Sequence, residues 1–446
     1  MSGAALKGEG LKALPAERSE STFEDFKEPY TKAQALVEAN RCLFCSDAPC
    51  IQACPTSIDI PQFIRKIATE NVHGSARTIF ESNILGMSCA RVCPVEVLCV
   101  GDCVYNELGV PPIQIGKLQR FATDAAFEAG TRFFEAGAST GKRVALIGGG
   151  PASLACAHEL RRHGHACTIF EKNALFGGLN TTGVAPYKMR ADRSLDEVEW
   201  VLGIGGIELR TGATVGRDVT FRELEDDYDA IFIGLGLGAD SKLGVPGEDL
   251  PGVHGAVDYI EKMKVGSVDV SGVKQAVVVG GGNTAIDCVR ELLGLGIPSV
   301  TMLYRGDRAG MSGYAHEWDA ACPEGARALW RRQPIELVGL DRVAHVRCVE
   351  LDEKKKPIAG TEHVVDAELV LVAIGQAKLG ELLSGLEGIT LDRGRVIVDE
   401  DGFTGRSKYF AGGDCANGGK EVVNAAAEGK RAAIAIDKLL GGNGHA

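Results

Sequence analysis

The sequence predicts an α-helical N-terminal domain followed by two Rossmann-like α/β domains, with the second of these inserted into the first. Three observations predict this. Eight of the 14 cysteines lie between Cys42 and Cys103, and two short apolar strands, 143–147 and 275–279, each run into a glycine-rich loop that opens a helix. A third strand, which ends in glycine and aspartate at 412–414, returns near the end of the chain. The domains expected are residues 1–140, residues 141–243 joined with 377–446, and residues 244–376.

The composition is that of an ordinary globular protein. Of the 446 residues, 45% are hydrophobic and 24% are charged, and the net charge of −12 argues against a nucleic-acid-binding protein, which normally carries a basic patch. The longest apolar runs, near 144–147 and 369–374, are far shorter than the roughly 18 residues that span a membrane. Met1–Arg18 lacks the apolar core of a signal peptide. We therefore expect a cytoplasmic protein that binds neither nucleic acid nor membrane.

The clustered cysteines have the spacing of an iron–sulfur protein. Dense cysteines in a reducing compartment bind metal more often than they form disulfides. The first run is Cys42-x2-Cys45-x4-Cys50-x3-Cys54-Pro55, and the second is Cys89-x3-Cys93-Pro94 followed by Cys99-x3-Cys103. The two Cys-Pro steps resemble ferredoxin signatures, whereas four-cysteine zinc sites usually pair Cys-x2-Cys knuckles. Iron–sulfur clusters are favoured over zinc, but the spacing does not assign each cysteine to a cluster. The other six cysteines are scattered, and we expect them to be small buried side chains.

Four amphipathic segments in this region predict helices. They are 31–40, 60–69, 75–82 and 116–129. Pro61 suits the first turn of the second segment. Gln119 lies on the last segment, where an amide is ordinarily a solvated surface residue.

The first glycine loop has the features of a dinucleotide site. The strand 143–147 leads into a G-x-G-x-x-S pattern, and an acid ends the next strand about 20 residues on. The first glycine makes the turn, the second lets the backbone approach a pyrophosphate at a helix N-terminus, and the acid would accept hydrogen bonds from a ribose. A turn without a ligand is disfavoured because strand, loop, helix and acid are all present. The residues expected at this site are Gly148, Gly150, Pro151, Ala152, Ser153 and Glu171.

The second loop follows an equally clear strand but differs at the end of the next one. There, no acid is in the expected place, and the chain reads Tyr304-Arg305-Gly306-Asp307-Arg308. An arginine at this point accommodates the 2′-phosphate of NADP, although arginines here can also be solvated or stack on an adenine. Asp307 could still reach a ribose. The loop residues expected to bind are Gly280, Gly282, Asn283, Thr284 and Ala285, with Arg305 and Arg308 beside them.

Two dinucleotide folds in one chain indicate two different dinucleotides. Three later stretches contain glycines, and one of them ends in an aspartate before a helix. This pattern resembles that of the flavin disulfide reductases, in which an aspartate bonds the ribityl chain and a helix end faces the isoalloxazine. This resemblance implies FAD at the first loop and NAD(P)H at the second. The further residues expected to contact these cofactors are Gly178, Leu179, Lys188, Ala373, Gly375, Gly413, Asp414, Val422 and Val423.

The cysteine runs, the stretch Asn83-Ile-Leu-Gly86 and the stretch Ile115-Gly-Lys-Leu-Gln119 together resemble the N-terminal portion of the dihydropyrimidine dehydrogenase family, over nearly the whole chain after about residue 20. The resemblance implies two [4Fe–4S] clusters. Their ligands would be Cys42, Cys45, Cys50 and Cys103 for one cluster, and Cys54, Cys93, Cys99 and Gln119 for the other. Cys89 would then not be a ligand. The small subunit of glutamate synthase is a more distant relative that tends to carry glutamate in place of Gln119.

The resemblance also implies an activity. NADH would reduce FAD, and electrons would pass through both clusters to a partner subunit of the FMN and ferredoxin type. That partner would reduce uracil or thymine to the 5,6-dihydro form, within a heterotetramer. No acid–base residue is expected on this chain, because the cofactors carry the redox chemistry. The alternatives are a glutamate synthase small subunit that uses NADPH, a stand-alone ferredoxin reductase, and a zinc-stapled docking module on a degenerate flavoprotein.

Overall fold

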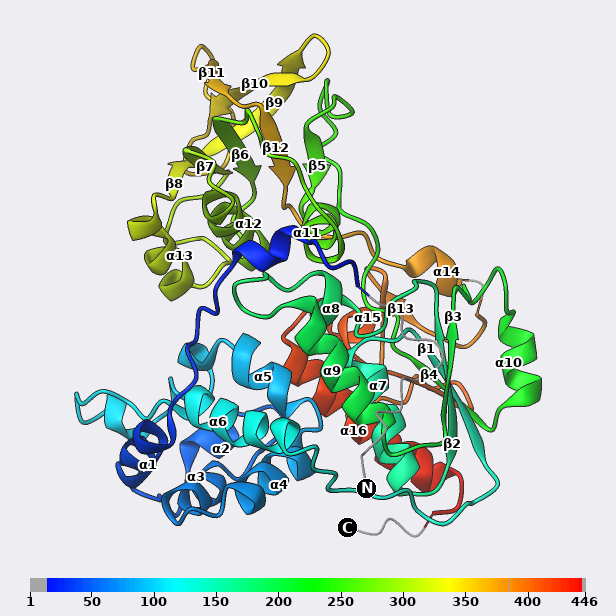
Figure 1. The fold of residues 1–446 in the computed structure, drawn as a ribbon. Coiled ribbons are helices and arrows are strands. Elements are labelled where there is room, and N and C mark those ends of the chain that lie inside the picture. The colour runs from blue at the N-terminus through cyan, green and yellow to red at the C-terminus, as the bar shows by residue number, and fades with distance from the viewer. Residues whose placement is uncertain (1–13, 385, 443–446) are drawn as a thin grey trace.

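The computed structural model describes residues 14–384 and 386–442. Most of the segment expected to lack a signal peptide, residues 1–13, lies outside these ranges. The cysteine-rich helices form one end of the molecule, and two sheets with their helices form the rest (Figure 1). The predicted fold class is confirmed. No helix in the described ranges is both long enough and apolar enough to cross a membrane.

The cysteine-rich domain is a bundle of short helices packed around an apolar centre. The side chains of Phe63, Ile64, Ile79 and Leu118 are fully buried between them. Thr31 starts the first helix with a capping box, in which its side chain accepts from Gln34 N. The helices are α1 (Lys32–Asn40), α2 (Pro49–Gln52), α3 (Ile60–Ala68), α4 (Val72–Ser82), α5 (Gly86–Val92) and α6 (Ile115–Glu128), with 3₁₀ turns η1 (Ser19–Thr22), η2 (Val95–Val97) and η3 (Val104–Asn106).

The first sheet combines strands from both ends of the α/β region. All five strands are parallel, in the order β15-β4-β1-β2-β3. They are β1 (Arg143–Ile147), β2 (Ala166–Glu171), β3 (Ile207–Thr211), β4 (Ala230–Ile233) and β15 (Tyr409–Ala411). Because β15 follows the second sheet in the chain yet pairs with β4, the predicted insertion is confirmed.

Two long helices cross closely over the first sheet. A Cβ on Gly429 of α16 would lie 2.1 Å from the carbonyl oxygen of Ala152 on α7, so only glycine permits this approach. The helices of this part are α7 (Pro151–Arg162), α8 (Leu179–Thr182), α9 (Ala191–Leu202), α10 (Phe221–Asp227), α14 (Gly380–Ser384), α15 (Asp414–Asn417) and α16 (Val422–Leu439), and β13 (Leu391–Asp392) and β14 (Arg395–Val396) form a small hairpin.

The second sheet is also parallel, in the order β5-β12-β6-β7-β8. Its strands are β5 (Val253–Gly255), β6 (Gln275–Val279), β7 (Ser299–Tyr304), β8 (Arg327–Trp330) and β12 (Leu369–Val372), and its helices are α11 (Ala256–Val265), α12 (Asn283–Gly294) and α13 (Ala315–Ala321), followed by the turn η4 (Cys322–Glu324). An antiparallel sheet of β9 (Arg332–Gly339), β10 (Val343–Glu350) and β11 (His363–Asp366) extends this domain.

All 14 cysteines are free thiols. Five of the six scattered cysteines are buried as expected, but the expectation is wrong for Cys322, which is exposed. It begins the turn after α13, whose buried face is formed by Trp318 and Ala321.

Candidate functional site

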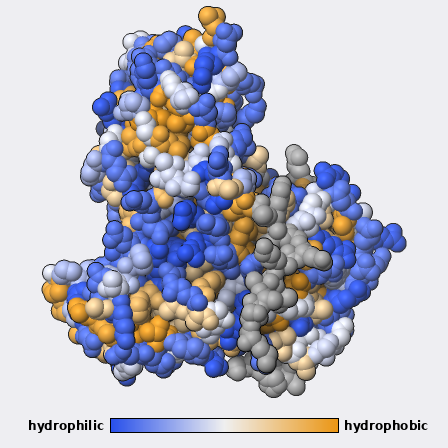
Figure 2. Space-filling view, viewed as in Figure 1, coloured by the Kyte–Doolittle hydropathy of each residue, from blue (hydrophilic) through white to orange (hydrophobic). Residues whose placement is uncertain are grey.

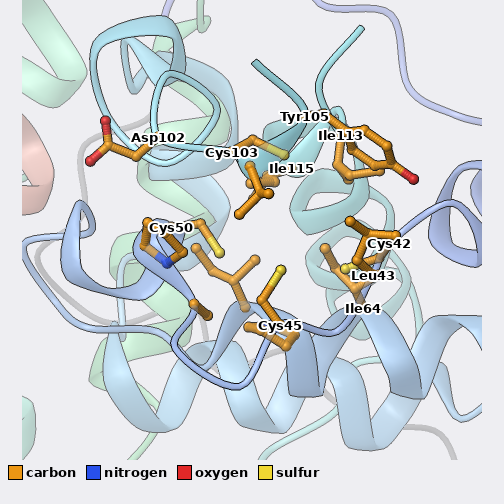
Figure 3. Close-up of a pocket in the computed structure, with 15 residues that line it drawn as sticks. Cys42, Leu43, Cys45, Cys50, Ile64, Asp102, Cys103, Tyr105, Ile113 and Ile115 are labelled. Atoms are coloured by element: carbon orange, nitrogen blue, oxygen red, sulfur yellow. The ribbon is translucent and has the colours of Figure 1, made fainter. Parts of the chain in front are cut away.

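Four cysteines from two distant segments line one pocket. Cys42, Cys45 and Cys50 come from the chain around α2, and Cys103 comes from the second cysteine run. Their thiols face a common hollow with apolar walls that include Ile64 (Figure 3). Burial, followed by the other three thiols, raises the pKa of Cys50 to about 12. Four thiols that disfavour their own ionisation fit a cationic centre bound by soft ligands, as an iron–sulfur cluster is.

The four thiols surround a hollow and do not converge on a single point. Among residues 14–384 and 386–442, no three Cys, His, Asp or Glu side chains lie close enough together to hold a single metal ion. The sequence brought these four cysteines together only through the family resemblance, and the structure places all four on the same pocket.

The second predicted ligand set is deeper in the molecule. Cys54, Cys93 and Cys99 are all buried. Burial raises the pKa of the Cys99 thiol, and the neighbouring Cys93 and Cys54 raise it further. Cys54 and Cys93 therefore lie close enough to Cys99 to affect its ionisation, which fits a second cluster bound by all three thiols.

Gln119 lies inside the protein and not on its surface. Its side chain on α6 is only 7% exposed, so the ordinary surface interpretation of this amide is wrong. Its Nε2 donates to the carbonyl oxygen of Gly86 across 2.8 Å. Within the described part of the chain, Gln119 Oε1 accepts no hydrogen bond, which leaves the amide oxygen for a ligand such as iron.

Cys89, the cysteine not expected to be a ligand, already has partners in the protein. Asn83 Nδ2 donates to its sulfur across 3.2 Å, and Cys89 also lies close enough to Cys93 to raise the pKa of that thiol. That it binds no iron stays a prediction.

The first glycine loop forms a narrow backbone cradle. Gly148 has φ +95°, and a Cβ there would lie 2.5 Å from the carbonyl oxygen of Gly234. Gly150 caps α7, and the nearest atom to a Cβ on it is the Cα of Gly178, 3.9 Å away. Pro151 takes the first position of the helix. Gly150 therefore packs against Gly178, and the N-terminus of α7 that opens beside them is the kind of place where the pyrophosphate of a dinucleotide binds.

Glu171 faces this loop and also hydrogen-bonds to its backbone. Its Oε2 accepts from Gly149 N and its Oε1 accepts from Asn173 N, both across 2.8 Å. Each carboxylate oxygen has a second lone pair, so the predicted ribose contact stays compatible with these bonds. The buried Oγ of Ser153 finds no partner among the described residues, which also fits a missing ligand at this loop.

The C-terminal segment returns to the same place. Gly413 has φ +75°, and a Cβ there would lie 3.0 Å from the Cβ of Ala152 on α7. Asp414 is half-buried, its burial raises the pKa of its carboxyl, and its Oδ1 accepts from Lys420 N across 3.3 Å. The structure thus brings Ala152, Gly413 and Asp414 together, as an FAD site requires, and α16 begins just beyond them at Val422.

The second glycine loop is equally tight. A Cβ on Gly280 would lie 2.2 Å from the carbonyl oxygen of Ala373, so the predicted residues of β6 and β12 meet here. Asn283 is held in the loop, because its Oδ1 accepts from Tyr314 N across 2.9 Å. This close packing leaves the N-terminus of α12 facing the space where a second dinucleotide would bind.

The arginines after β7 have different surroundings. Arg308 forms an ion pair with Asp319, whereas Arg305 is exposed and has no ion pair among the residues described. The sequence missed Arg331, which adopts φ +55° and pairs with Asp307 across 3.4 Å. No local motif marks Arg331, because only the pairing of β7 with β8 brings it to this edge.

Lys188 joins the two dinucleotide domains. Its Nζ lies 2.9 Å from Asp287 Oδ1 and 2.8 Å from Glu317 Oε1. Burial alone would lower its pKa, but the two carboxylates outweigh burial and raise it. The predicted flavin contact of Lys188 stays a prediction, since the structure describes its amine in these ion pairs.

Contacts between side chains connect the second glycine loop to the start of α16 and to the inner cysteines. Tyr314, which holds Asn283, donates from its hydroxyl to Glu421 Oε1 across 2.8 Å, and Glu421 directly precedes α16. Glu421 in turn lies close enough to Cys93 to influence its thiol. The first cysteine pocket is half-exposed, whereas the second cysteine set is buried. These contacts connect the second loop, the start of α16 and the buried cysteines.

Comparison with known proteins identifies the family of each part of the chain. The family described as dihydropyrimidine dehydrogenase domain II, 4Fe-4S cluster, matches residues 18–131, and the family described as pyridine nucleotide-disulphide oxidoreductase matches residues 142–429. The chain belongs to the pyridine nucleotide-disulphide oxidoreductases. It is an oxidoreductase of the FAD, NAD(P) and 4Fe–4S type, as the sequence predicted.

Two kinds of curated relative match over almost their whole length. The small chain of glutamate synthase [NADPH] from Halomonas elongata is 36% identical over 95% of this chain and 94% of the relative. The PreT subunit of NAD-dependent dihydropyrimidine dehydrogenase from Escherichia coli is 33% identical over 94% of this chain and 98% of the relative. The predicted relationship to these two groups is confirmed.

Solved structures share the fold of the α/β region. FprA of Mycobacterium tuberculosis in complex with NADPH is 20% identical and matches with a TM-score of 0.53, over 67% of this chain and 86% of its own. The thioredoxin reductase of T. acidophilum is also 20% identical and matches with a TM-score of 0.54, over 66% of this chain and 97% of its own. At this identity the likeness shows the fold alone.

Proposed function

We propose that this chain is the electron-input subunit of a dihydropyrimidine dehydrogenase. NADH would bind at the loop that begins with Gly280, FAD at the loop that begins with Gly148, and the two cysteine sets would hold [4Fe–4S] clusters. When bound, these cofactors supply hydride acceptance and one-electron transfer. A partner subunit with FMN would reduce uracil or thymine to the 5,6-dihydro form, and the two subunits would form a heterotetramer. The domain bounds are proposed at 140, 243 and 376.

The single observation that carries the proposal is the connection between the second loop, the start of α16 and the buried cysteines. The Tyr314–Glu421 hydrogen bond links the second loop to the start of α16, and Glu421 is near enough to Cys93 to help raise the pKa of its thiol. The chain's residues then have distinct tasks. The glycine loops hold phosphates, Asp414 faces the flavin-type site, and the buried cysteines separate that site from the surface.

The exit of this path coincides with exposed apolar side chains. Leu43 lines the surface cysteine pocket and is 53% exposed. Leu108 and Val110 are also exposed, on the loop whose Pro111 carbonyl accepts from Arg41 at the end of α1. Figure 2 shows apolar surface gathered over the cysteine-rich end of the molecule. An apolar rim around an electron exit favours delivery to a docked protein over delivery to a small soluble acceptor.

A second candidate, the small subunit of a glutamate synthase, is favoured by the slightly higher identity of 36%. Gln119 argues for the pyrimidine enzyme, because the resemblance associates glutamate at this position with glutamate synthase. In both candidates the chain performs the same input of electrons, and they differ in the partner.

The experiment that separates them is reconstitution with each class of partner. The purified chain is mixed with the FMN-containing subunit of a dihydropyrimidine dehydrogenase or with the large chain of a glutamate synthase. Oxidation of NADH, and separately of NADPH, is followed with uracil or with glutamine and 2-oxoglutarate. The proposal predicts dihydrouracil only with the first partner, and no uracil reduction by the chain alone. Uracil reduction without a partner, or glutamate formation with the second, would contradict it.

A further inference from the structure

Glu197 of the flavin-type domain holds the backbone of a helix in the cysteine-rich domain. Its Oε1 accepts from Met87 N across 2.9 Å and from Ser88 N across 3.1 Å, and its Oε2 accepts from Ser88 Oγ. Glu197 lies on α9 with 1% of its surface exposed, and Met87 and Ser88 begin α5. Burial raises the pKa of the Glu197 carboxyl to about 7. This carboxyl therefore fixes α5 from another domain, in a setting unfavourable to its charge.

The same hydroxyl reaches the flavin-type loop. Asn180 Nδ2 donates to Ser88 Oγ across 2.8 Å, and both residues are buried. Asn180 directly follows Gly178 and Leu179, which are the predicted flavin contacts. Its Oδ1 has no partner within the described ranges. A chain of hydrogen bonds thus runs from the loop after β2, through Ser88, to Glu197.

On its other side, α5 holds the residues predicted to bind the inner cluster. The carbonyl oxygen of Gly86 accepts from Gln119 Nε2 across 2.8 Å, which orients the amide. Cys93 follows the last turn of α5, with its backbone N–H donating to Cys89 O across 3.1 Å. Figure 1 shows α5 beside α9. A shift of α5 would therefore move Cys93 and release Gln119 at the same time.

We propose that Glu197 is a positioning residue for the inner iron–sulfur cluster, which it aligns with the flavin by fixing α5. Through Gly86 it sets the direction of the Gln119 amide, and through the helix it sets the place of Cys93. This inference rests on the proposed ligand roles of Gln119 and Cys93. A support that spans two domains ties the distance between the donor and the acceptor to one carboxyl, which a purely local contact would not do.

The test uses the cofactor-loaded full chain with Glu197→Ala and Glu197→Gln. Glu199→Ala is the matched control, because Glu199 lies on the same helix and is exposed. The measurements are iron and FAD content, the EPR spectrum after chemical reduction, and the rate of electron transfer from flavin to cluster. Alanine removes both acceptors of the α5 N–H groups, whereas the glutamine oxygen can still accept them.

The proposal predicts that Glu197→Ala keeps its FAD and its rate of flavin reduction by NADH within about twofold, while the flavin-to-cluster step slows about tenfold. The EPR signal of one cluster shifts, and glutamine restores it. Unchanged EPR and transfer rate in Glu197→Ala would overturn the inference.

If Glu197→Ala fails to fold, Glu197→Asp takes its place, because the shorter side chain withdraws the carboxylate from the Met87 and Ser88 N–H groups and keeps its charge. A slower flavin-to-cluster step supports the inference, and a normal rate and spectrum overturn it. A wild-type chain that carries FAD but lacks the inner cluster would overturn the proposed ligand set first, and the role of Glu197 with it. A wild-type chain with both clusters and an unaffected variant would overturn the role of Glu197 alone.

Discussion

Tyr314 donates a hydrogen bond from its hydroxyl to Glu421 across 2.8 Å, and so joins the second dinucleotide domain to the helix that begins at Val422. Burial raises the pKa of the Glu421 carboxyl, and burial together with the neighbouring Glu421 raises the pKa of the Tyr314 hydroxyl above its usual range. The bond is therefore one between a neutral phenol and an enclosed carboxyl at the boundary of two domains.

Removal of this hydroxyl should slow the reduction of the flavin. We expect Tyr314→Phe to lower the rate of flavin bleaching by NADH about fivefold and the free energy of unfolding by about 1–2 kcal/mol, because Glu421 loses its donor. Stopped-flow absorbance and denaturant unfolding measure the two effects. Tyr259→Phe is the control, since the Tyr259 hydroxyl makes no hydrogen bond within the described residues. Equal rates in Tyr314→Phe and wild type would contradict the expected role.

Lys264 should make the stability depend on pH in the alkaline range. It is fully buried on α11 and donates to the carbonyl oxygens of Val184 and Met189 across 2.7 and 2.8 Å. Burial lowers its pKa to about 8 from the model-compound value of 10.5. Between pH 8 and 10.5 the unfolded chain binds a proton that the folded chain does not, so folding is favoured as the pH rises.

Relative to Lys264→Met, the wild type should therefore gain about 3 kcal/mol of unfolding free energy from pH 8 to 10.5. Denaturant unfolding at several pH values measures this difference. Lys262→Met, which changes an exposed lysine of the same helix, should show no such gain. A difference between wild type and Lys264→Met that is independent of pH would show that the amine is not the titrating group.

The assignment of cysteines to clusters predicts opposite results for the same substitution at a ligand and at a non-ligand cysteine. Cys50→Ser should lose about four of about eight irons, because one cluster loses a thiolate ligand. Cys89→Ser should keep all of them, because the Cys89 sulfur already accepts from Asn83. Iron and sulfide analysis of anaerobically purified protein measures both. Iron loss in Cys89→Ser would mean that the ligand set is wrongly assigned.

The arginines after β7 predict how coenzyme choice responds to substitution. Arg308 is paired with Asp319, which leaves Arg305 as the free guanidinium at this edge. We expect Arg305→Ala to lower kcat/KM for NADPH about tenfold and for NADH less than about twofold, since only NADPH carries a 2′-phosphate. Dye reduction with each coenzyme tests this. Equal losses with both coenzymes would instead indicate that Arg305 stacks on the adenine.

The central strands of the parallel sheets could be predicted almost to the residue, whereas the edge strands β3, β5 and β8 were not predicted. The strands 143–147 and 275–279 coincide with β1 and β6, because strands buried on both faces appear as continuous apolar runs. The antiparallel sheet β9–β11 was not predicted. Its strands mix exposed and buried residues, and β9 contains a proline, so no apolar run or clean alternation marks them.

The candidate sites also contain residues that the sequence could predict and residues that it could not. Glycine loops are local in the sequence, so Gly148, Gly150 and Gly280 could be placed from their order alone. The burial of Gln119, the pairing of Arg331 and the grip of Glu197 on α5 depend on contacts between segments that are far apart in the chain. These contacts are visible only in the three-dimensional structure, because no local sequence pattern predicts them.

The most direct test of the account is the cofactor content of the wild-type chain purified without oxygen. The account predicts one FAD with about eight irons and eight sulfides per chain, as two [4Fe–4S] clusters require. Protein that is folded but contains zinc in place of iron, or that has no flavin absorbance to be bleached by NADH, would contradict it.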